Sequence, residues 1–314
     1  MGAGELQLQF RPEEAEQIAK RFGQDFLATV EQRGKTLSKD WGLSEVELIP
    51  SYSANLVLRC QAERYGPSVL KLAPSRSAEL RTELQALRSY EGTRFCRLYE
   101  ADLENGALLI EAIQPGTPLR EVGRLEERIQ AFCSVYEGLH RPPVSDEVYP
   151  TYLDWVTRIA AYMTREAAGS PLQQAICRAE ELCRELSLRY SRPLLLHGDL
   201  HHDNLLLDRA GEYRIIDPKG VVGDPIWDLP RFLLNELEDE PSDEVYVRMN
   251  RAISLLENRL GVPEPVLRKC LYVETAMGFS WCVEDGADAD EQRRLAEMMA
   301  FCEAICFPGA ASNP

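Results

Sequence analysis

The segment His197-Gly198-Asp199-Leu200-His201-His202-Asp203-Asn204 is the most informative stretch of the 314-residue sequence. It contains three of the four histidines of the chain and lies between two leucine triplets, residues 194–196 and 205–207. Apolar runs of this kind, bounded by polar loops, are typical of short buried strands. A polar loop between two such strands is a common place for catalytic side chains, because the rigid strands fix their positions. A third short apolar run ends at Asp217, in Ile216-Asp217-Pro218-Lys219-Gly220.

The spacing H-x-D-x-x-x-x-N followed by D-x-x-G fits phosphoryl transfer to a hydroxyl group. That reaction needs a carboxylate that orients the hydroxyl and accepts its proton, and oxygen ligands for a Mg²⁺ ion that bridges the phosphates. Asp199 is the predicted catalytic base, and Asn204 and Asp217 are the predicted Mg²⁺ ligands. Each motif alone is also compatible with an Asx turn or a type I turn, but their combination in this order favours catalysis.

The reaction also needs a cation on the nucleotide phosphates, and Lys71 is the candidate. It lies in the β-prone run Ser68–Leu72, where alternation directs it away from Leu70 and Leu72, so that they can face the core and it can face a cleft. Glu79 and Glu83 lie one turn apart on the helix expected next, and either can pair with Lys71. Glu83 is favoured, because the apolar residues that follow it would bury its face of the helix.

The pattern of the whole chain predicts an α+β protein of two lobes. The N-terminal lobe, residues 1–113, is expected to hold an amphipathic helix and a mostly antiparallel nucleotide-binding sheet. The C-terminal lobe, residues 114–314, is expected to be helical and to hold the catalytic loop and the acceptor site, with a cleft between the lobes. Strands are predicted at 46–49, 56–60, 69–72, 97–101 and 107–113, and helices at 12–34, 79–90, 119–139, 152–167, 172–190, 227–238, 242–260, 263–283 and 291–306.

Composition narrows the possible partners. The formal net charge is −16, which disfavours nucleic acid; it indicates either ordinary solubility or a cationic ligand. The nine cysteines are odd in number and form no C-x-x-C pair, so they are interpreted as small apolar residues of a reducing compartment rather than as disulfides or a zinc site. No secretory signal or membrane-spanning run is recognised. We expect a cytoplasmic protein with no membrane partner.

These motifs resemble those of the aminoglycoside phosphotransferase branch of the protein-kinase-like fold, and most of all its streptomycin 6-phosphotransferase and hydroxyurea resistance kinases. The resemblance extends over about residues 51–229. It implies a bilobal kinase fold that uses ATP or GTP with Mg²⁺. The residues that carry it are His197–Asn204, Ile216–Pro225 with Asp228-Leu229, Ala107–Glu111 with Pro115-Gly116, and Glu83 with Ala86-Leu87.

The resemblance also implies roles for further residues. Lys71 would contact the α- and β-phosphates, the purine base would bind backbone groups near Glu111 and Ile113, and Asp228 would brace the catalytic loop. The run Ser51–Val57 lacks the glycines of a protein-kinase phosphate loop. Backbone N–H groups from Ser53 to Asn55 would therefore contact the phosphates instead.

The acceptor site is expected on the helical lobe, facing Asp199. Carboxylates and an aromatic ring suit a cationic sugar or a guanidinium group, and the candidates are Glu274, Trp281, Glu284 and Asp285. The alternative is that Trp281 is a core residue and the acids belong to the surface.

For the remaining polar residues near the motifs, structural roles or exposure to solvent are considered. His197 is expected to brace the loop by hydrogen bonds, and His202 to be solvated or to line the substrate site. Lys219 is either a solvated turn residue or a contact of the phosphates. His140 is expected to interact with the C-terminal end of a helix, and Glu236 to lie on a solvated face.

The leading hypothesis is a Mg²⁺-dependent kinase that phosphorylates a hydroxyl of an aminoglycoside-like, streptomycin-type antibiotic or a related small acceptor. A metabolic kinase that acts on choline, homoserine or a sugar is the nearest alternative. A pseudokinase that binds nucleotide without turnover is a third possibility. The presence of Lys71, Asp199, Asn204 and Asp217 argues against the pseudokinase, because a binding module has no need for the base.

Overall fold

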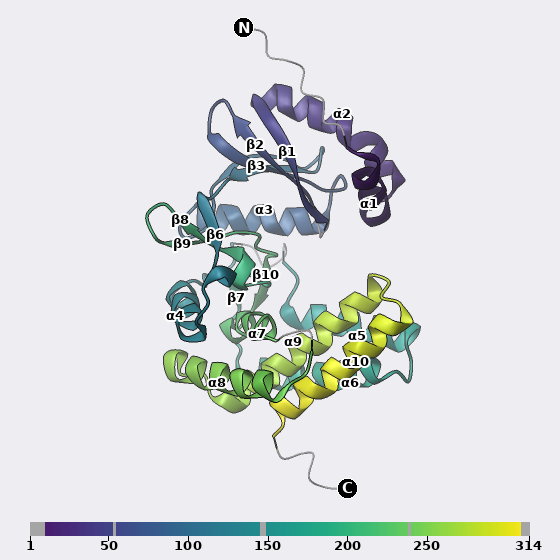
Figure 1. Cartoon of the computed structure of the whole chain (residues 1–314), viewed down its shortest axis with the longest axis vertical. Helices are drawn as coiled ribbons and strands as arrows, with labels where there is room; N and C mark the ends of the chain where they lie inside the picture. The colour runs from purple at the N-terminus through teal and green to yellow at the C-terminus, as the bar shows by residue number, and fades with distance from the viewer. Residues whose placement is uncertain (1–9, 53–54, 145–148, 238–239, 309–314) are drawn as a thin grey trace. The chain divides into compact units, whose positions relative to one another are not determined.

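A computed structural model describes residues 10–52, 55–144, 149–237 and 240–308 of the chain (Figure 1). The chain forms two compact units. Unit 1 contains the residues up to Thr117 together with Leu206–Ile216, and unit 2 contains Pro118–Leu205 and the residues from Asp217 onward. The expected lobe boundary after residue 113 stays a prediction.

Unit 1 is built on a five-stranded antiparallel sheet with the order β1-β2-β3-β5-β4. The helix α3 (Ala78–Tyr90) follows the third strand, as predicted. The turn between the last two strands contains Gly106 at φ +60°, in agreement with the Asn-Gly turn signal. The strands are β1 (Leu43–Tyr52), β2 (Leu56–Ala62), β3 (Gly66–Leu72), β4 (Leu98–Asp102) and β5 (Ala107–Glu111).

The two faces of this sheet are covered by different helices (Figure 1). Leu70 and Leu72 of β3 join a core that the helices α1 (Pro12–Phe22) and α2 (Gln24–Trp41) cover with Ile18 and Val30. Lys71 lies between these leucines and contacts α3, so α3 covers the opposite face. The alternation predicted for Lys71 is therefore confirmed.

A short hairpin from the middle of the chain belongs to unit 1. It consists of β8 (Leu205–Asp208) and β9 (Tyr213–Ile215), which form a three-stranded sheet with β6 (Pro115–Pro118). The carbonyl oxygen of Ile215 accepts a hydrogen bond from the Cys96 N–H at 2.9 Å. These contacts attach the segment that precedes Asp217 to unit 1.

Unit 2 is mainly helical, as predicted. Its helix α9 (Glu264–Glu284) is buried along most of its length. The helices packed against it are α5 (Tyr152–Glu166), α6 (Pro171–Arg189), α7 (Pro230–Leu234) and α10 (Ala289–Cys306). Two strands, β7 (Leu194–Leu196) and β10 (Val221–Gly223), pair antiparallel and flank the predicted catalytic loop, residues 197–204. The described part of unit 2 also contains α4 (Leu125–Tyr136) and α8 (Asp243–Leu260). The 3₁₀ turns found there are η1 (Leu119–Glu121), η2 (His202–Asn204) and η3 (Pro225–Asp228).

Three predicted helices were wrong in extent. The expected helix 12–34 is divided at Gly23, which adopts a φ of +92°, a backbone conformation that glycine reaches without steric cost. The second of the two helices continues to Trp41. The expected helix 119–139 is a 3₁₀ turn followed by α4, and the expected helix 227–238 is reduced to α7, which begins at Pro230. Proline favours the first turn of a helix, because it lacks the N–H group that an interior position needs.

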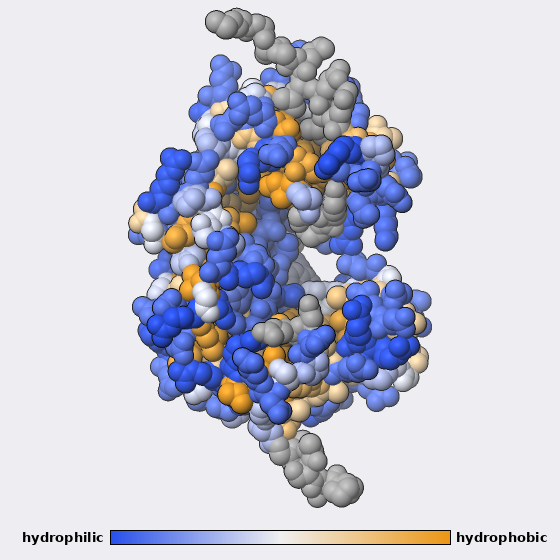
Figure 2. Space-filling model, in the orientation of Figure 1, coloured by the Kyte–Doolittle hydropathy of each residue, from blue (hydrophilic) through white to orange (hydrophobic). Residues whose placement is uncertain are grey.

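The surface carries few large apolar side chains. Most of the visible face in Figure 2 is hydrophilic, and the most exposed large hydrophobic residues of the described chain are Val144, Leu188 and Val247. Within the described ranges, every helix is too short or too polar to cross a membrane.

Candidate active site

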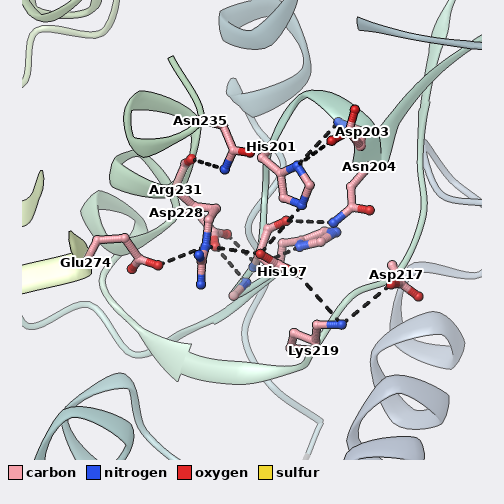
Figure 3. Close-up of polar contacts among 12 residues, drawn as sticks. His197, His201, Asp203, Asn204, Asp217, Lys219, Asp228, Arg231, Asn235 and Glu274 are labelled. Carbon is pink, nitrogen blue, oxygen red and sulfur yellow. Dashed lines mark hydrogen bonds and ion pairs between the residues drawn. The ribbon is translucent and has the colours of Figure 1, made fainter. Parts of the chain in front are cut away.

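The predicted catalytic loop is fixed at its first two residues by a buried carboxylate. Asp228 lies beside His197 (Figure 3) and accepts hydrogen bonds from the backbone N–H groups of His197 at 2.8 Å and Gly198 at 2.7 Å. It also lies 3.0 Å from His140 Nε2. Burial alone would raise the pKa of Asp228, but the hydrogen bond and charge of His140 outweigh it and lower the pKa. Asp228 is thus placed to brace the loop, the role expected for it. The expectation for His140 was wrong, because its ring binds Asp228.

Gly198 has no room for a side chain. Its φ is +80°, and a Cβ at this position would lie 2.8 Å from the ring of Trp155 and 2.9 Å from Val221. Both the backbone conformation and the close packing therefore require glycine immediately before Asp199.

Asp199, the predicted base, is partly exposed and is surrounded by cations. Its Oδ1 lies 3.1 Å from Arg231 Nε, and its Oδ2 lies 3.8 Å from Lys219 Nζ. Its backbone N–H donates to His197 Nδ1 at 3.1 Å, so His197 braces the loop as predicted. Burial would raise the pKa of Asp199, but the nearby charges, above all that of Arg231 and also that of Lys219, outweigh it and lower the pKa. An ionised carboxylate at this position can accept a hydrogen bond from a substrate hydroxyl.

Asn204 and Asp217 provide oxygen donors of the type that Mg²⁺ prefers. The Asn204 Nδ2 donates to the carbonyl oxygen of Asp199 at 2.8 Å, which leaves the side-chain oxygen directed away from this bond (Figure 3). Asp217 has φ +64° at the start of its turn, and its Oδ2 lies 3.5 Å from Lys219 Nζ. Among the described residues, no three His, Cys, Asp or Glu side chains gather into a metal-binding group. A carboxylate with an amide oxygen still fits a Mg²⁺ ion that takes its other ligands from phosphates and water.

Three of the predicted nucleotide-binding residues, Lys71, Glu83 and Asn55, lie together in unit 1. Lys71 Nζ contacts Glu83 Oε1 with both side chains buried, so Glu83 rather than Glu79 is the partner of the lysine. Asn55 is buried beside them, and its Nδ2 lies 3.4 Å from Glu83 Oε2. Ser53 lies outside the described residues.

Glu111 ends the strand β5, and the structure places Ile113 just after it. The Glu111 backbone N–H donates to the Arg97 carbonyl oxygen at 2.9 Å, and its side chain accepts from the Arg97 N–H at 3.1 Å. Strand β5 stops at Glu111, so Ile113 lies in the connection that follows rather than in the strand expected to reach it.

Most of the predicted acceptor residues are engaged within unit 2. Glu274 is buried, accepts a hydrogen bond from Tyr152 and lies 2.9 Å from Arg231 Nε. Glu284 accepts two hydrogen bonds from Arg158, at 2.6 and 2.9 Å. Asp285 is exposed.

Trp281 and His202 differ in their surroundings. Trp281 is half-buried, and its ring lies 6.0 Å from that of Trp155 in a T-shaped contact. His202 is buried against Phe232, with its Nε2 2.8 Å from Glu236 Oε1. The expectations of a solvated His202 and a solvated Glu236 were both wrong.

Arg231 is the residue of this site that the sequence analysis missed. It lies in α7 and contacts both the Asp199 and Glu274 carboxylates (Figure 3). Burial alone would lower the pKa of Arg231, but these carboxylates raise it, so the guanidinium stays charged. Its position three residues after Asp228, in the same short segment, was the available signal.

Two further arginines hold the end of the catalytic loop. Arg120 forms a two-pronged contact with Asp203, with both N···O distances 2.7 Å. Arg128 contacts Glu236 in the same manner at 2.8 and 2.6 Å, and Glu236 in turn contacts His202. Paired geometry of this kind restricts orientation as well as position.

The chain is similar to known antibiotic kinases over most of its length. The family model described as aminoglycoside/hydroxyurea antibiotic resistance kinase matches residues 40–286. The streptomycin 6-kinase of Streptomyces glaucescens is 27% identical over 278 residues, which cover 85% of this chain and 87% of that protein. The hydroxyurea phosphotransferase of Kitasatospora aureofaciens is 28% identical over 298 residues, which cover 91% of this chain and 84% of that protein.

Solved structures confirm the protein-kinase-like fold. The choline kinase LicA from Streptococcus pneumoniae has a TM-score of 0.66 at 14% identity, covering 88% of this chain and 99% of that one. An aminoglycoside phosphotransferase in ternary complex with ADP and hygromycin B has a TM-score of 0.63 at 15% identity, covering 88% and 99% of the two chains. Both likenesses concern the fold.

Proposed function

Since the chain belongs to the aminoglycoside/hydroxyurea antibiotic resistance kinase family, we propose that it transfers the γ-phosphoryl group of ATP or GTP to a hydroxyl of a streptomycin-type aminoglycoside or a related small acceptor. The observation that carries the proposal is the Asp199 carboxylate. It is ionised, partly exposed and held on a loop that Asp228 fixes through two backbone hydrogen bonds. A binding module has no need for so closely held a base.

In the proposed reaction, the acceptor hydroxyl oxygen forms a new bond to the γ-phosphorus, and the bond from that phosphorus to the bridging oxygen breaks. The nucleoside diphosphate leaves with the electron pair of the broken bond. Asp199 orients the hydroxyl and accepts its proton. General-base catalysis of this kind typically increases the rate by about 10²- to 10⁴-fold. The residues that act on the acceptor side are thus Asp199 and the groups that hold it.

Asn204 and Asp217 would hold the Mg²⁺ ion, which when bound would neutralise charge on the phosphates. Lys71 would contact the α- and β-phosphates, and Glu83 would keep its ammonium oriented. The backbone groups near Glu111 and Ile113 would bind the purine base.

The predicted binding site for a cationic acceptor is revised, because two of its acids have arginine partners. Glu274 and Glu284 already pair with Arg231 and Arg158. Attraction for a cation is therefore proposed to come from the net charge of −16 of the chain as a whole, with Trp281 as an aromatic wall. The metabolic alternative keeps one specific support, the likeness in fold to a choline kinase.

An acceptor screen tests the proposal. Purified protein with Mg²⁺ and ATP or GTP would be offered streptomycin, hygromycin B, hydroxyurea, choline, homoserine and simple sugars, with nucleoside diphosphate release as the readout. Transfer to an aminoglycoside or to hydroxyurea supports the proposal. Transfer to choline, homoserine or a sugar alone would replace it with the metabolic alternative, and binding of nucleotide without transfer to any compound would favour the pseudokinase.

A further inference from the structure

Lys219 lies beside both carboxylates that the proposed reaction uses. Its Nζ is 3.8 Å from Asp199 Oδ2 and 3.5 Å from Asp217 Oδ2, and Figure 3 shows its ammonium between the catalytic loop and Asp217. The side chain is 28% exposed, so it is neither the solvated turn residue considered from the sequence nor sealed in the core. A single cation therefore connects the base with the predicted metal ligand.

The backbone fixes this placement. The Lys219 N–H donates to the carbonyl oxygen of His197 at 2.8 Å, which ties the turn to the residue two positions before Asp199. Pro218 restricts the turn, since its ring fixes φ near −65°. The residues that follow enter β10, which pairs with β7 on the other side of the loop. The strand pair β7–β10 therefore holds both the loop that contains Asp199 and the turn that contains Lys219.

We propose that Lys219 is a catalytic residue of the kinase reaction and that its ammonium binds the γ-phosphoryl oxygens during transfer. The inference rests on the proposed function. In that reaction the phosphoryl group leaves phosphates held at Asp217 and reaches a hydroxyl held at Asp199. The Lys219 ammonium, which is within 4 Å of both carboxylates, would therefore lie close to the phosphoryl group during its transfer. It stabilises the charge on the equatorial oxygens while the new O–P bond forms and the old one breaks.

The distances favour exchange of partners over a permanent ion pair. Charge-assisted N–H···O contacts have typical lengths of about 2.7–2.9 Å, and both Lys219 contacts are longer. An ammonium on a flexible stem can turn from carboxylate to phosphate oxygens. Arg231 is less suited to this role, because it lies against the other oxygen of Asp199 and also pairs with the buried Glu274.

Nucleotide binding provides the first test, and it requires no acceptor. Calorimetry with Mg²⁺ would compare ADP with a non-hydrolysable triphosphate analogue in wild type, Lys219→Met and Lys219→Arg. We expect Lys219→Met to lose about tenfold in triphosphate affinity, with ADP affinity changed less than about threefold, because the ammonium meets only the terminal phosphate. Lys219→Arg should keep part of the preference for triphosphate. Lys269→Met, a lysine of α9 paired with Glu185 at 2.9 Å, is the matched control and should leave both affinities unchanged.

Steady-state kinetics provide the second test, on the acceptor found in the screen. We expect kcat to fall by about 10²- to 10³-fold in Lys219→Met, the range typical for removal of one group that stabilises transition-state charge, and to recover partly in Lys219→Arg. Two results would overturn the inference: unchanged triphosphate affinity and kcat in Lys219→Met, or an equal loss of ADP and triphosphate affinity. Thermal unfolding of each variant identifies a loss of fold. If wild type phosphorylates no acceptor, the proposed function fails, and the ADP-against-triphosphate comparison still decides the role of Lys219.

Discussion

Three buried carboxylates of unit 2 each receive a cationic or hydrogen-bonding partner close to the catalytic loop. Asp228 pairs with His140, Glu236 with Arg128 and Glu274 with Arg231. An isolated carboxylate at such depth would cost several kcal/mol, so each partner is needed to keep the charge buried. These three carboxylates and their partners are thus held in place before any substrate binds.

Glu236 allows a test of this arrangement by pH. Burial would raise its pKa, but the hydrogen bonds from His202 and Arg128 outweigh burial and lower the pKa to about 2 from the ordinary value of 4.5. A lowered folded-state pKa means that the stabilisation is fully present above pH 4.5 and is lost as the pH falls toward 2. The shift corresponds to roughly 3 kcal/mol of unfolding free energy.

We therefore expect Glu236→Gln to lower the free energy of unfolding at pH 7 and to flatten its decline below pH 4.5. Denaturant titrations at several pH values would measure both effects. Glu166→Gln, which changes an exposed glutamate paired with Arg165, is the control and should follow wild type at every pH. An acid profile of Glu236→Gln that is parallel to wild type would contradict the assignment.

At the scale of elements, the strand pair β7–β10 and the glycine between β7 and the base determine how Asp199 is presented. Gly198 requires a positive φ, and a Cβ added there would meet Trp155 and Val221 at less than 3 Å. Gly169 has nearly the same φ, +81°, but nothing within 4 Å of the corresponding position. The two glycines separate the effect of backbone strain from that of crowding.

Gly198→Ala should therefore destabilise the protein more than Gly169→Ala does. Both substitutions bear the cost of a side chain at positive φ, of the order of 1 kcal/mol, and only Gly198→Ala adds overpacking of about 1–3 kcal/mol. Thermal unfolding compares the two variants, and nucleotide turnover should fall in Gly198→Ala alone. Equal losses of stability in both would show that the packing around Gly198 can relax.

Sequence patterns predicted the elements well where apolar side chains alternate with polar ones or form a continuous run. The alternation around Lys71 predicted its direction, and the apolar residues that follow Glu83 favoured Glu83 as its helical partner. The apolar runs 194–196 and 205–207 predicted the strands on either side of the predicted catalytic loop. The short strand β10 and the 3₁₀ turns were not predicted, because three or four residues carry too little periodicity.

The residues missed around the base share a physical cause. Arg231 reaches Asp199 from α7, and Arg128 reaches Glu236 from α4, over a sequence separation of 108 residues. A charged side chain on a helix is usually exposed, so the sequence alone predicts that such a residue faces solvent and not that it forms a buried ion pair. Only the packing of the helices reveals which charges meet.

At the scale of the whole molecule, the net charge of −16 bears on the acceptor. The acids Glu274 and Glu284 are paired, so attraction for a cationic acceptor would come from many exposed acids rather than from one. Such attraction is screened over about 8 Å at physiological ionic strength.

The acceptor KM should accordingly rise with salt if the acceptor is cationic, while kcat changes little. Titration of KM between about 0.05 and 0.5 M NaCl, at saturating nucleotide, measures the effect. Hydroxyurea, a neutral acceptor, offers a comparison that salt should leave unchanged if the protein accepts it. A cationic acceptor whose KM is independent of salt would contradict the role given to the charge.

The substitution Asp199→Asn tests whether this chain is a kinase whose base is Asp199. The measurement is phosphoryl transfer to the acceptor from the screen, together with the nucleotide dissociation constant. We predict a fall in kcat of about 10²- to 10⁴-fold with nucleotide affinity nearly unchanged, because the base acts on the acceptor hydroxyl and the amide keeps the size of the side chain. Turnover near that of wild type in Asp199→Asn would contradict the claim.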